Sequence, residues 1–295
     1  RSRNDGLMEA RNGGTLRLLG ITLDQGLTGT LSAANGSAVV LSGTVVQGGT
    51  LDSSGNGLLL LEGSSSRIED LHVANGAHLL VPCFRELEIS GGIDNDGLIE
   101  VNNAGCGPNF ATLRGQGEVL IEGAGSVLLG ASSEFGVAAT LASAGPSLVL
   151  GPAQTLAGYG TLSGNLRVEG AIAPRQTFAP LGEAGQLILA SGAQLQLAPS
   201  SEFLLDVLSA SSFDRIAGSG AVTLDGTLRI VLPTGFETDG PISLDIVSGA
   251  EVSGAFDQII LPASRPCGVA SVELLPDRAR LTLDVPLYCS GFEAP

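Results

Sequence analysis

The stretch GSGAVTLDGTLRIVL, residues 218–232, alternates apolar and polar residues on both sides of a glycine turn. Alternation of this kind predicts a half-buried strand, because successive side chains of a strand point to opposite faces. Asp225 and Gly226, which separate the two runs, are residue types that favour a sharp change of direction. The stretch therefore predicts two short strands joined at a tight turn.

Similar short units fill the sequence. Runs rich in Leu, Val and Ile end at Gly, Asn, Ser or Asp, and no segment has the apolar spacing of an amphipathic helix. Gly-Thr-Leu or Gly-Thr-Val recurs, starting at Gly14, Gly29, Gly43, Gly49, Gly160 and Gly226. Such irregular repetition is typical of a β-solenoid, in which each coil buries its aliphatic side chains on the next. A β-sandwich is the alternative, but an aromatic content of 4% favours the narrow aliphatic core of a solenoid.

We therefore predict an all-β chain, a right-handed parallel β-helix (β-solenoid) with a C-terminal β cap. A cap is expected because an open solenoid end is an unpaired sheet edge. Pro174 and Pro180 interrupt the strand rhythm, and composition changes again after residue 232. The expected divisions are a flexible or strand-donating segment at 1–13, coils at 14–170, a C-terminal solenoid section at 171–232, and a β cap with a disulfide-pinned tail at 233–295.

The charge balance excludes several partners. The 295 residues carry a net charge of −16, and all 14 basic residues are arginine. An acidic surface repels nucleic acid and anionic lipid, and no run of 18 apolar residues predicts membrane insertion. The absence of lysine excludes a Schiff-base lysine. No cofactor is expected, with calcium as the one exception considered below.

The four cysteines predict an oxidising compartment. Cys83 and Cys106 lie in one region and Cys267 and Cys289 in another, so pairing within each region is favoured over the two other connectivities. Each bridge would close a loop of about 20 residues and contribute roughly 3 kcal/mol. Disulfides place the protein outside the cytoplasm, extracellular or at the cell surface. Four reduced thiols in a cytosolic protein are the alternative. Because the sequence begins at Arg1 without a methionine, we expect a processed or excised piece.

The segment IDNDGLIEVNN, residues 93–103, is the candidate cation site. Asp94, Asn95 and Asp96 place oxygen donors before a glycine, as calcium loops do. The segment lacks the bidentate glutamate that completes such loops. An Asn-Asp-Gly sequence is also an ordinary hairpin turn or coil corner, which is the structural alternative.

Candidate catalytic groups are few. Polysaccharide hydrolysis needs carboxylates that converge, and the close pairs are Glu86 with Glu88 and Asp94 with Asp96. No tryptophan is present to stack on a sugar. His72 and His78 are the only histidines. A triad of Asp70, His72 and one of Ser64, Ser65 and Ser66 is not expected, since nothing resembles a nucleophile elbow. We therefore predict that the protein is not an enzyme.

Residues 158–285 carry a series of landmarks: GYGTL at 158–162, GAIAP at 170–174, GQLIL at 185–189, FDRI at 213–216, LDGTL at 224–228, VSGAFD at 252–257 and ILP at 260–262. This series resembles the C-terminal part of autotransporter passenger domains and related secreted bacterial β-helix proteins. The resemblance implies a β-helix and export, and it implies no particular activity. Arg175 departs from the family, which usually has glycine after the proline. Gly291-Phe292-Glu293 resembles the tails of some secreted proteobacterial proteins.

The expected function is that of an extracellular structural or adhesive surface protein. The expected partner is a second copy, through head-to-tail fibre assembly in which residues 1–11 are donated as a strand. Folding back of this segment as its own cap is the alternative. A surface glycan or host ligand is a further expected partner. A third hypothesis is that the chain itself is a calcium-dependent glycan-binding module. A polysaccharide-active β-helix enzyme, hydrolase or lyase, remains the alternative function.

Overall fold

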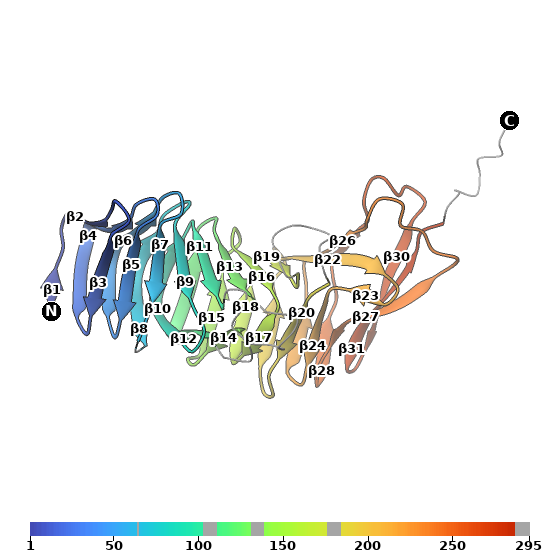
Figure 1. Cartoon of the computed structure of the whole chain (residues 1–295). Helices are drawn as coiled ribbons and strands as arrows, with labels where there is room; N and C mark the ends of the chain where they lie inside the picture. The colour runs from blue at the N-terminus through green and yellow to red at the C-terminus, as the bar shows by residue number, and fades with distance from the viewer. Residues whose placement is uncertain (64, 103–110, 131–138, 176–183, 287–295) are drawn as a thin grey trace.

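A computed structural model describes residues 1–63, 65–102, 111–130, 139–175 and 184–286, and the regular structure within these ranges is entirely β. The strands stack along one axis from the N-terminus to the C-terminus and form an elongated molecule (Figure 1). Neighbouring coils pair in parallel along most of this axis. The predicted fold class, an all-β parallel β-helix with a C-terminal β cap, is confirmed.

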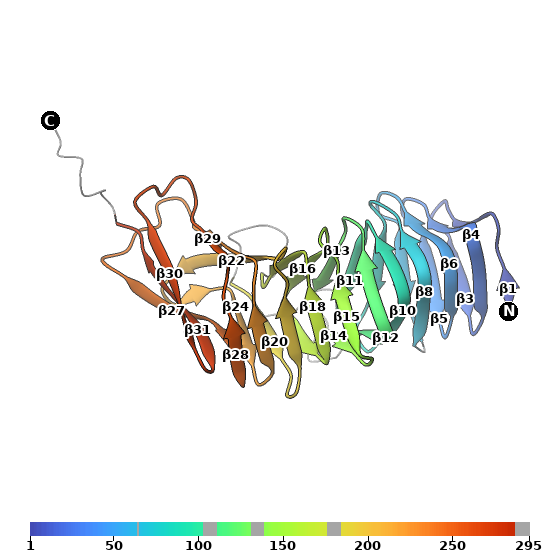
Figure 2. The ribbon, with the colours of Figure 1, turned by 180° about the vertical axis from the view of Figure 1, so that it is seen from behind.

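The coil strands lie on three faces. In each of the early coils, a single long strand bends over the first two faces. These strands are β4 (Thr22–Ala33), β6 (Val45–Ser53), β8 (Ser66–Val73), β10 (Glu86–Asn95) and β12 (Ala111–Glu122). Separate strands cover the first face at β1 (Ser2–Arg3), β14 (Ala139–Ser143), β17 (Gly160–Ser163), β20 (Gln186–Leu189), β24 (Arg215–Gly218) and β27 (Ile242–Ser248). Separate strands cover the second face at β2 (Leu7–Ala10), β15 (Ser147–Leu150), β18 (Asn165–Val168), β21 (Gln194–Leu197), β25 (Ala221–Leu224) and β28 (Glu251–Gly254). Figure 2 shows these two faces from behind.

The third face is a single ladder. In order along the axis it contains β3 (Thr15–Leu19), β5 (Ala38–Ser42), β7 (Leu58–Leu61), β9 (His78–Val81), β11 (Leu98–Val101), β13 (Ser126–Leu129), β16 (Thr155–Gly158), β19 (Ala171–Ala173), β22 (Glu202–Ser209), β26 (Thr227–Val231) and β29 (Gln258–Ile260). The register stacks one inward column, namely Val39, Leu59, Leu79, Ile99, Val127, Leu156, Ile172, Phe203, Leu228 and Ile259. One apolar cluster extends from Ala10 to Val285, so the coils share a continuous core.

The stretch at 218–232 forms β25 and β26, as its alternation predicts. The two strands do not pair with each other, because β25 pairs with β21 and β28 whereas β26 pairs with β22 and β29. Gly226 turns the chain from one face to the next with φ at +71°, and a Cβ there would lie 2.4 Å from the carbonyl oxygen of Ser201. Only glycine tolerates this corner without strain.

The two ends are built differently. Residues 1–13, which we expected to be flexible or strand-donating, contain β1 and β2, and both pair in parallel with β4. At the other end, β27 pairs with β31 (Arg278–Asp284), and β31 pairs with β30 (Val269–Leu275), both in antiparallel fashion. This antiparallel ribbon is the cap. The parallel coils continue past residue 232 as far as β29, beside the cap. The short strand β23 (Ser212–Phe213) pairs only with β22 in the described chain.

Candidate functional site

The predicted calcium residues do not face the same way. Asp94 and Asp96 point outward from the end of β10, whereas Asn95 is buried. Asn95 donates a hydrogen bond from Nδ2 to Oε1 of Gln154 at 3.0 Å, inside the core. The expectation that three consecutive donors form one calcium loop is therefore wrong for Asn95, because strand alternation directs it inward. The segment is a coil corner between β10 and β11 and not a hairpin, because β10 pairs with β8 and β11 pairs with β9.

The third side chain beside Asp94 and Asp96 on the outer surface is that of His72. His72 lies directly beside Asp94 in the ladder between β8 and β10, and its Nε2 lies 3.3 Å from Oδ2 of Asp96. The ligand atoms of His72, Asp94 and Asp96 all lie within 4.8 Å of one another. Sequence reasoning missed this group. The available signal was the coil repeat, since Thr50, His72 and Asp94 follow one another at a spacing of 22 residues and stack in register.

Backbone contacts hold Asp96 in its charged form. The backbone N–H of Ala124 donates to Oδ1 of Asp96 at 2.8 Å. This hydrogen bond, followed by the one from His72, lowers the pKa of Asp96 below its ordinary value. The carboxylate is therefore ionised and fixed in direction at neutral pH. Beside the group, a hollow of about 460 Å³ is lined by His72 and Asp94 together with Leu27, Gly49, Thr50, Asp70, Leu71 and Gly92.

The other histidine has a simpler environment. Nε2 of His78, on β9, lies 2.7 Å from Oε2 of Glu100, on β11. Both side chains are partly exposed on the third face. Among the described residues, no third carboxylate, histidine or cysteine completes this pair as a metal-ligating group. His78 and Glu100 thus form a second His–carboxylate pair, which has one potential metal ligand fewer than the group of His72, Asp94 and Asp96.

The other candidate catalytic carboxylates contact side chains of a neighbouring coil. Glu86 and Glu88 share one outer face, but Glu86 forms an ion pair with Arg114 at 2.8 Å and Glu88 accepts a hydrogen bond from Gln116 at 3.4 Å. These contacts run between neighbouring coils, β10 and β12, and they stabilise the ladder.

No triad forms around His72 within the described residues. Ser66 is buried, and its Oγ accepts a hydrogen bond from the backbone N–H of Thr44 at 3.2 Å. Oδ1 of Asp70 accepts a hydrogen bond from Gly92 at 2.9 Å, whereas His72 contacts Asp96. Ser64 lies outside the described residues.

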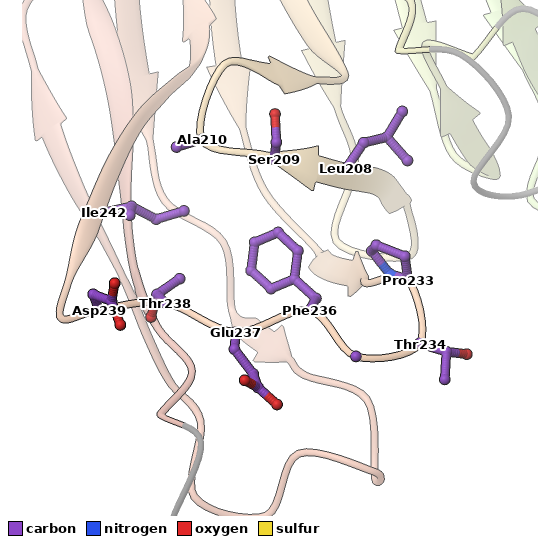
Figure 3. A pocket seen from close by; sticks show the side chains of 11 residues that line it. Leu208, Ser209, Ala210, Pro233, Thr234, Phe236, Glu237, Thr238, Asp239 and Ile242 are labelled. Carbon is purple, nitrogen blue, oxygen red and sulfur yellow. The ribbon is translucent and has the colours of Figure 1, made fainter.

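A second hollow lies near the C-terminal cap (Figure 3). It has a volume of about 460 Å³ and lies between the end of β22 and the segment 233–242. Phe236 lies at its centre, only 8% exposed, while Glu237 and Asp239 lie at the rim. Ser209 lines the hollow, and its Oγ accepts hydrogen bonds from the N–H groups of Ser211 and Ser212 and so caps a turn. Apolar and hydroxyl side chains line the hollow, and two carboxylates lie at its rim.

Three charged residues lie buried at the junction that follows Pro174. Nη2 of Arg175 lies 3.7 Å from Oδ1 of Asp206. Asp214 accepts hydrogen bonds from the N–H groups of Gly185 at 2.8 Å and Asp206 at 3.2 Å. Burial, with a smaller contribution from the nearby Asp206 charge, raises the pKa of Asp214 to about 7. Arg175, the departure from the family pattern, is therefore one partner of a buried ion pair.

The cysteine prediction falls partly outside the described residues. Cys83 and Cys267 are described, and no described cysteine is free. Their predicted partners, Cys106 and Cys289, lie outside the described ranges, so the pairing stays a prediction.

No protein-family model and no curated protein sequence matches the chain. The resemblance to autotransporter passenger domains therefore stays an expectation that rests on the motifs at 158–285. Among the described residues there is no helix of the length and apolarity needed to cross a membrane.

Proposed function

We propose that the chain is an extracellular structural or adhesive element: a stiff β-helical rod that associates end to end with further copies. The observation that carries this proposal is the contrast between the two ends of the stack, in both charge and exposed apolar surface. Three properties of the protein bear on the proposal: the stiffness of the rod, the chemistry of its two ends, and its compartment.

Stiffness follows from the ladder on the third face. Ten consecutive parallel pairings join β3 to β29 within the described chain. At the usual spacing of neighbouring strands, this ladder is about 50 Å long. The inward column is almost entirely aliphatic, and each side chain packs on those of adjacent coils. Such a stack resists bending because every inner coil is held by backbone hydrogen bonds on both sides.

The two ends differ in charge. Residues 1–17 contain four arginines and two carboxylates, whereas residues 233–286 contain three arginines and eight carboxylates. All four of these arginines form ion pairs, two of them with Asp24 and Glu62 of later coils, so the N-terminal end is close to neutral in a chain with a net charge of −16. Its arginines can also pair with the carboxylates of the acidic C-terminal end of a second copy, which favours head-to-tail contact over side-by-side contact between acidic flanks.

Exposed apolar side chains concentrate at the same ends. Of the seven large apolar side chains that are exposed in the described chain, four lie there: Leu7 and Leu19 in the first coil, and Val269 and Leu274 on β30. β30 pairs only with β31, and β3 pairs only with β5, in the described chain. Unpaired edges with apolar side chains are surfaces on which another strand can add.

The proposed compartment rests on the cysteines. If the protein is extracellular, mass spectrometry of the protein isolated from its source should find Cys83–Cys106 and Cys267–Cys289 linkages. Free thiols at all four positions would contradict an extracellular location.

Sedimentation velocity over a concentration series tests the end-to-end contact. The average sedimentation coefficient of the wild type should rise with concentration at low salt, and less so at high salt, because salt screens the charge contact. The double variant Arg3→Glu with Arg11→Glu should remain monomeric. The matched control, Arg114→Glu with Arg167→Glu, changes charge equally on the flank of the rod and should associate like the wild type. A wild type that is monomeric at every concentration would overturn the proposal, as would a control that loses association equally.

A further inference from the structure

We propose that His72, Asp94 and Asp96 form a binding site for a divalent transition-metal ion, for which Zn²⁺ is the probe. The three side chains come from two neighbouring coils and meet on the outer surface. The inference is independent of the proposed end-to-end association, because the site lies on the flank of the rod.

The ligand atoms already have the spacing that such an ion needs. Zinc holds nitrogen and oxygen ligands at about 2.0–2.2 Å in a tetrahedron, which places neighbouring ligand atoms about 3.4 Å apart. Nε2 of His72 and Oδ2 of Asp96 lie 3.3 Å apart. All three ligand atoms lie within 4.8 Å, so an inward rotation of the exposed Asp94 side chain completes the set.

The fold holds these groups in place. His72 and Asp94 are register partners on β8 and β10, so their backbones are fixed one strand spacing apart. Asp96 is held from outside the set by the N–H of Ala124. Second contacts of this kind orient a metal ligand. Two carboxylates around one imidazole supply two negative charges to balance a divalent ion.

The donor set distinguishes this site from the calcium loop that the sequence suggested. Imidazole nitrogen binds zinc, copper, iron and nickel, whereas calcium prefers six to eight oxygens. With Asn95 buried in the core, only two side chains of the loop offer oxygen to an ion on the surface. The hollow beside His72 and Asp94 leaves room for water in the remaining coordination positions, as in zinc sites with an open position.

Isothermal titration of the oxidised, EDTA-treated protein with Zn²⁺ tests the site, and Co²⁺ absorption reports its geometry. The wild type should bind one Zn²⁺ and give a visible Co²⁺ band typical of four- or five-coordination. His72→Ala and Asp94→Asn should each weaken Zn²⁺ binding at least tenfold. His78→Ala is the matched control, because it removes the other His–carboxylate pair, and it should bind as the wild type does.

Three results would overturn the inference. The first is a wild type without Zn²⁺ binding. The second is an equal loss in His72→Ala and His78→Ala, which would indicate nonspecific binding to histidines. The third is displacement of Zn²⁺ by an equal concentration of Ca²⁺, which would show that the imidazole is not a ligand. Circular dichroism of each variant checks that the coils are intact, since both histidines lie on the surface.

Discussion

Before Pro174 every charged side chain of the described chain lies at least partly in solvent, whereas the section that follows buries Arg175, Asp206 and Asp214. In the early coils, alternation alone separates charge from core, and opposite charges pair across neighbouring coils on the surface, as Arg114 and Glu86 do. At the junction, charge lies inside and joins segments that are distant in sequence. The same solenoid thus uses ion pairs in two environments, with different energetic consequences.

The largest effect that separates the two environments should come from Arg175. Replacement by Met leaves the buried carboxylates of Asp206 and Asp214 without their cation, and we expect a loss of about 3–5 kcal/mol in the free energy of unfolding. Arg167, which pairs with Glu169 on the surface at 2.9 Å, is the matched control, and Arg167→Met should cost below about 1 kcal/mol. Urea unfolding measures both, and equal losses would contradict a special role for the buried cluster.

The second largest loss in the free energy of unfolding should come from the aliphatic column on the third face. Leu79 is fully buried between Leu59 and Ile99, and Leu79→Ala should cost about 2–5 kcal/mol because neighbouring coils cannot collapse into the cavity. Leu27, which is 98% exposed, provides the control, and Leu27→Ala should leave the unfolding midpoint unchanged. If Leu79→Ala left the free energy of unfolding unchanged, the coils would repack independently of one another.

The pH dependence of stability tests the buried environment of Asp214. Its pKa is raised to about 7 in the folded protein, above its value in an unfolded chain, about 3.9. The folded state therefore holds the extra proton between these values, and stability falls as pH rises from about 4 to 7, by at most about 1.4 kcal/mol per pH unit. Asp214→Asn should remove this slope. Parallel stability–pH curves for wild type and variant would contradict the raised pKa.

The smallest effect should come from the surface pair of Glu86 and Arg114. Glu86→Gln should lower the free energy of unfolding by below about 1 kcal/mol, because both side chains are partly solvated. Urea unfolding at low and high salt measures the difference, which should shrink as salt rises. The same variant bears on the alternative function: any polysaccharide cleavage by the wild type that Glu86→Gln abolishes would favour an enzyme.

The strands and their faces could be predicted from sequence because a solenoid core is a local pattern. Each short alternating run places its own side chains, and Gly226 marks a corner by its conformation. The site could not be predicted in the same way. His72 and Asp96 meet only when the coils are stacked in register, and Asn95 was misassigned because three consecutive donors were considered as a loop and not as an alternating strand end.

The buried cluster was hidden for a related reason. Arg175 looked only like a departure from a glycine position, and Asp214 looked like one landmark of a motif. Their partnership through Asp206 depends on the pairing of β22 with β23 and on the bridge between Arg175 and Ala184. Alternation carries no information about such contacts, because they join charges that a local pattern would assign to the surface.

Negative-stain electron microscopy of the oxidised protein over a concentration series tests the central claim most directly. The account predicts single rods at low concentration and longer rods or fibres at high concentration, with an axial repeat close to the length of one molecule. Single short rods at every concentration, or particles joined along their flanks, would contradict it.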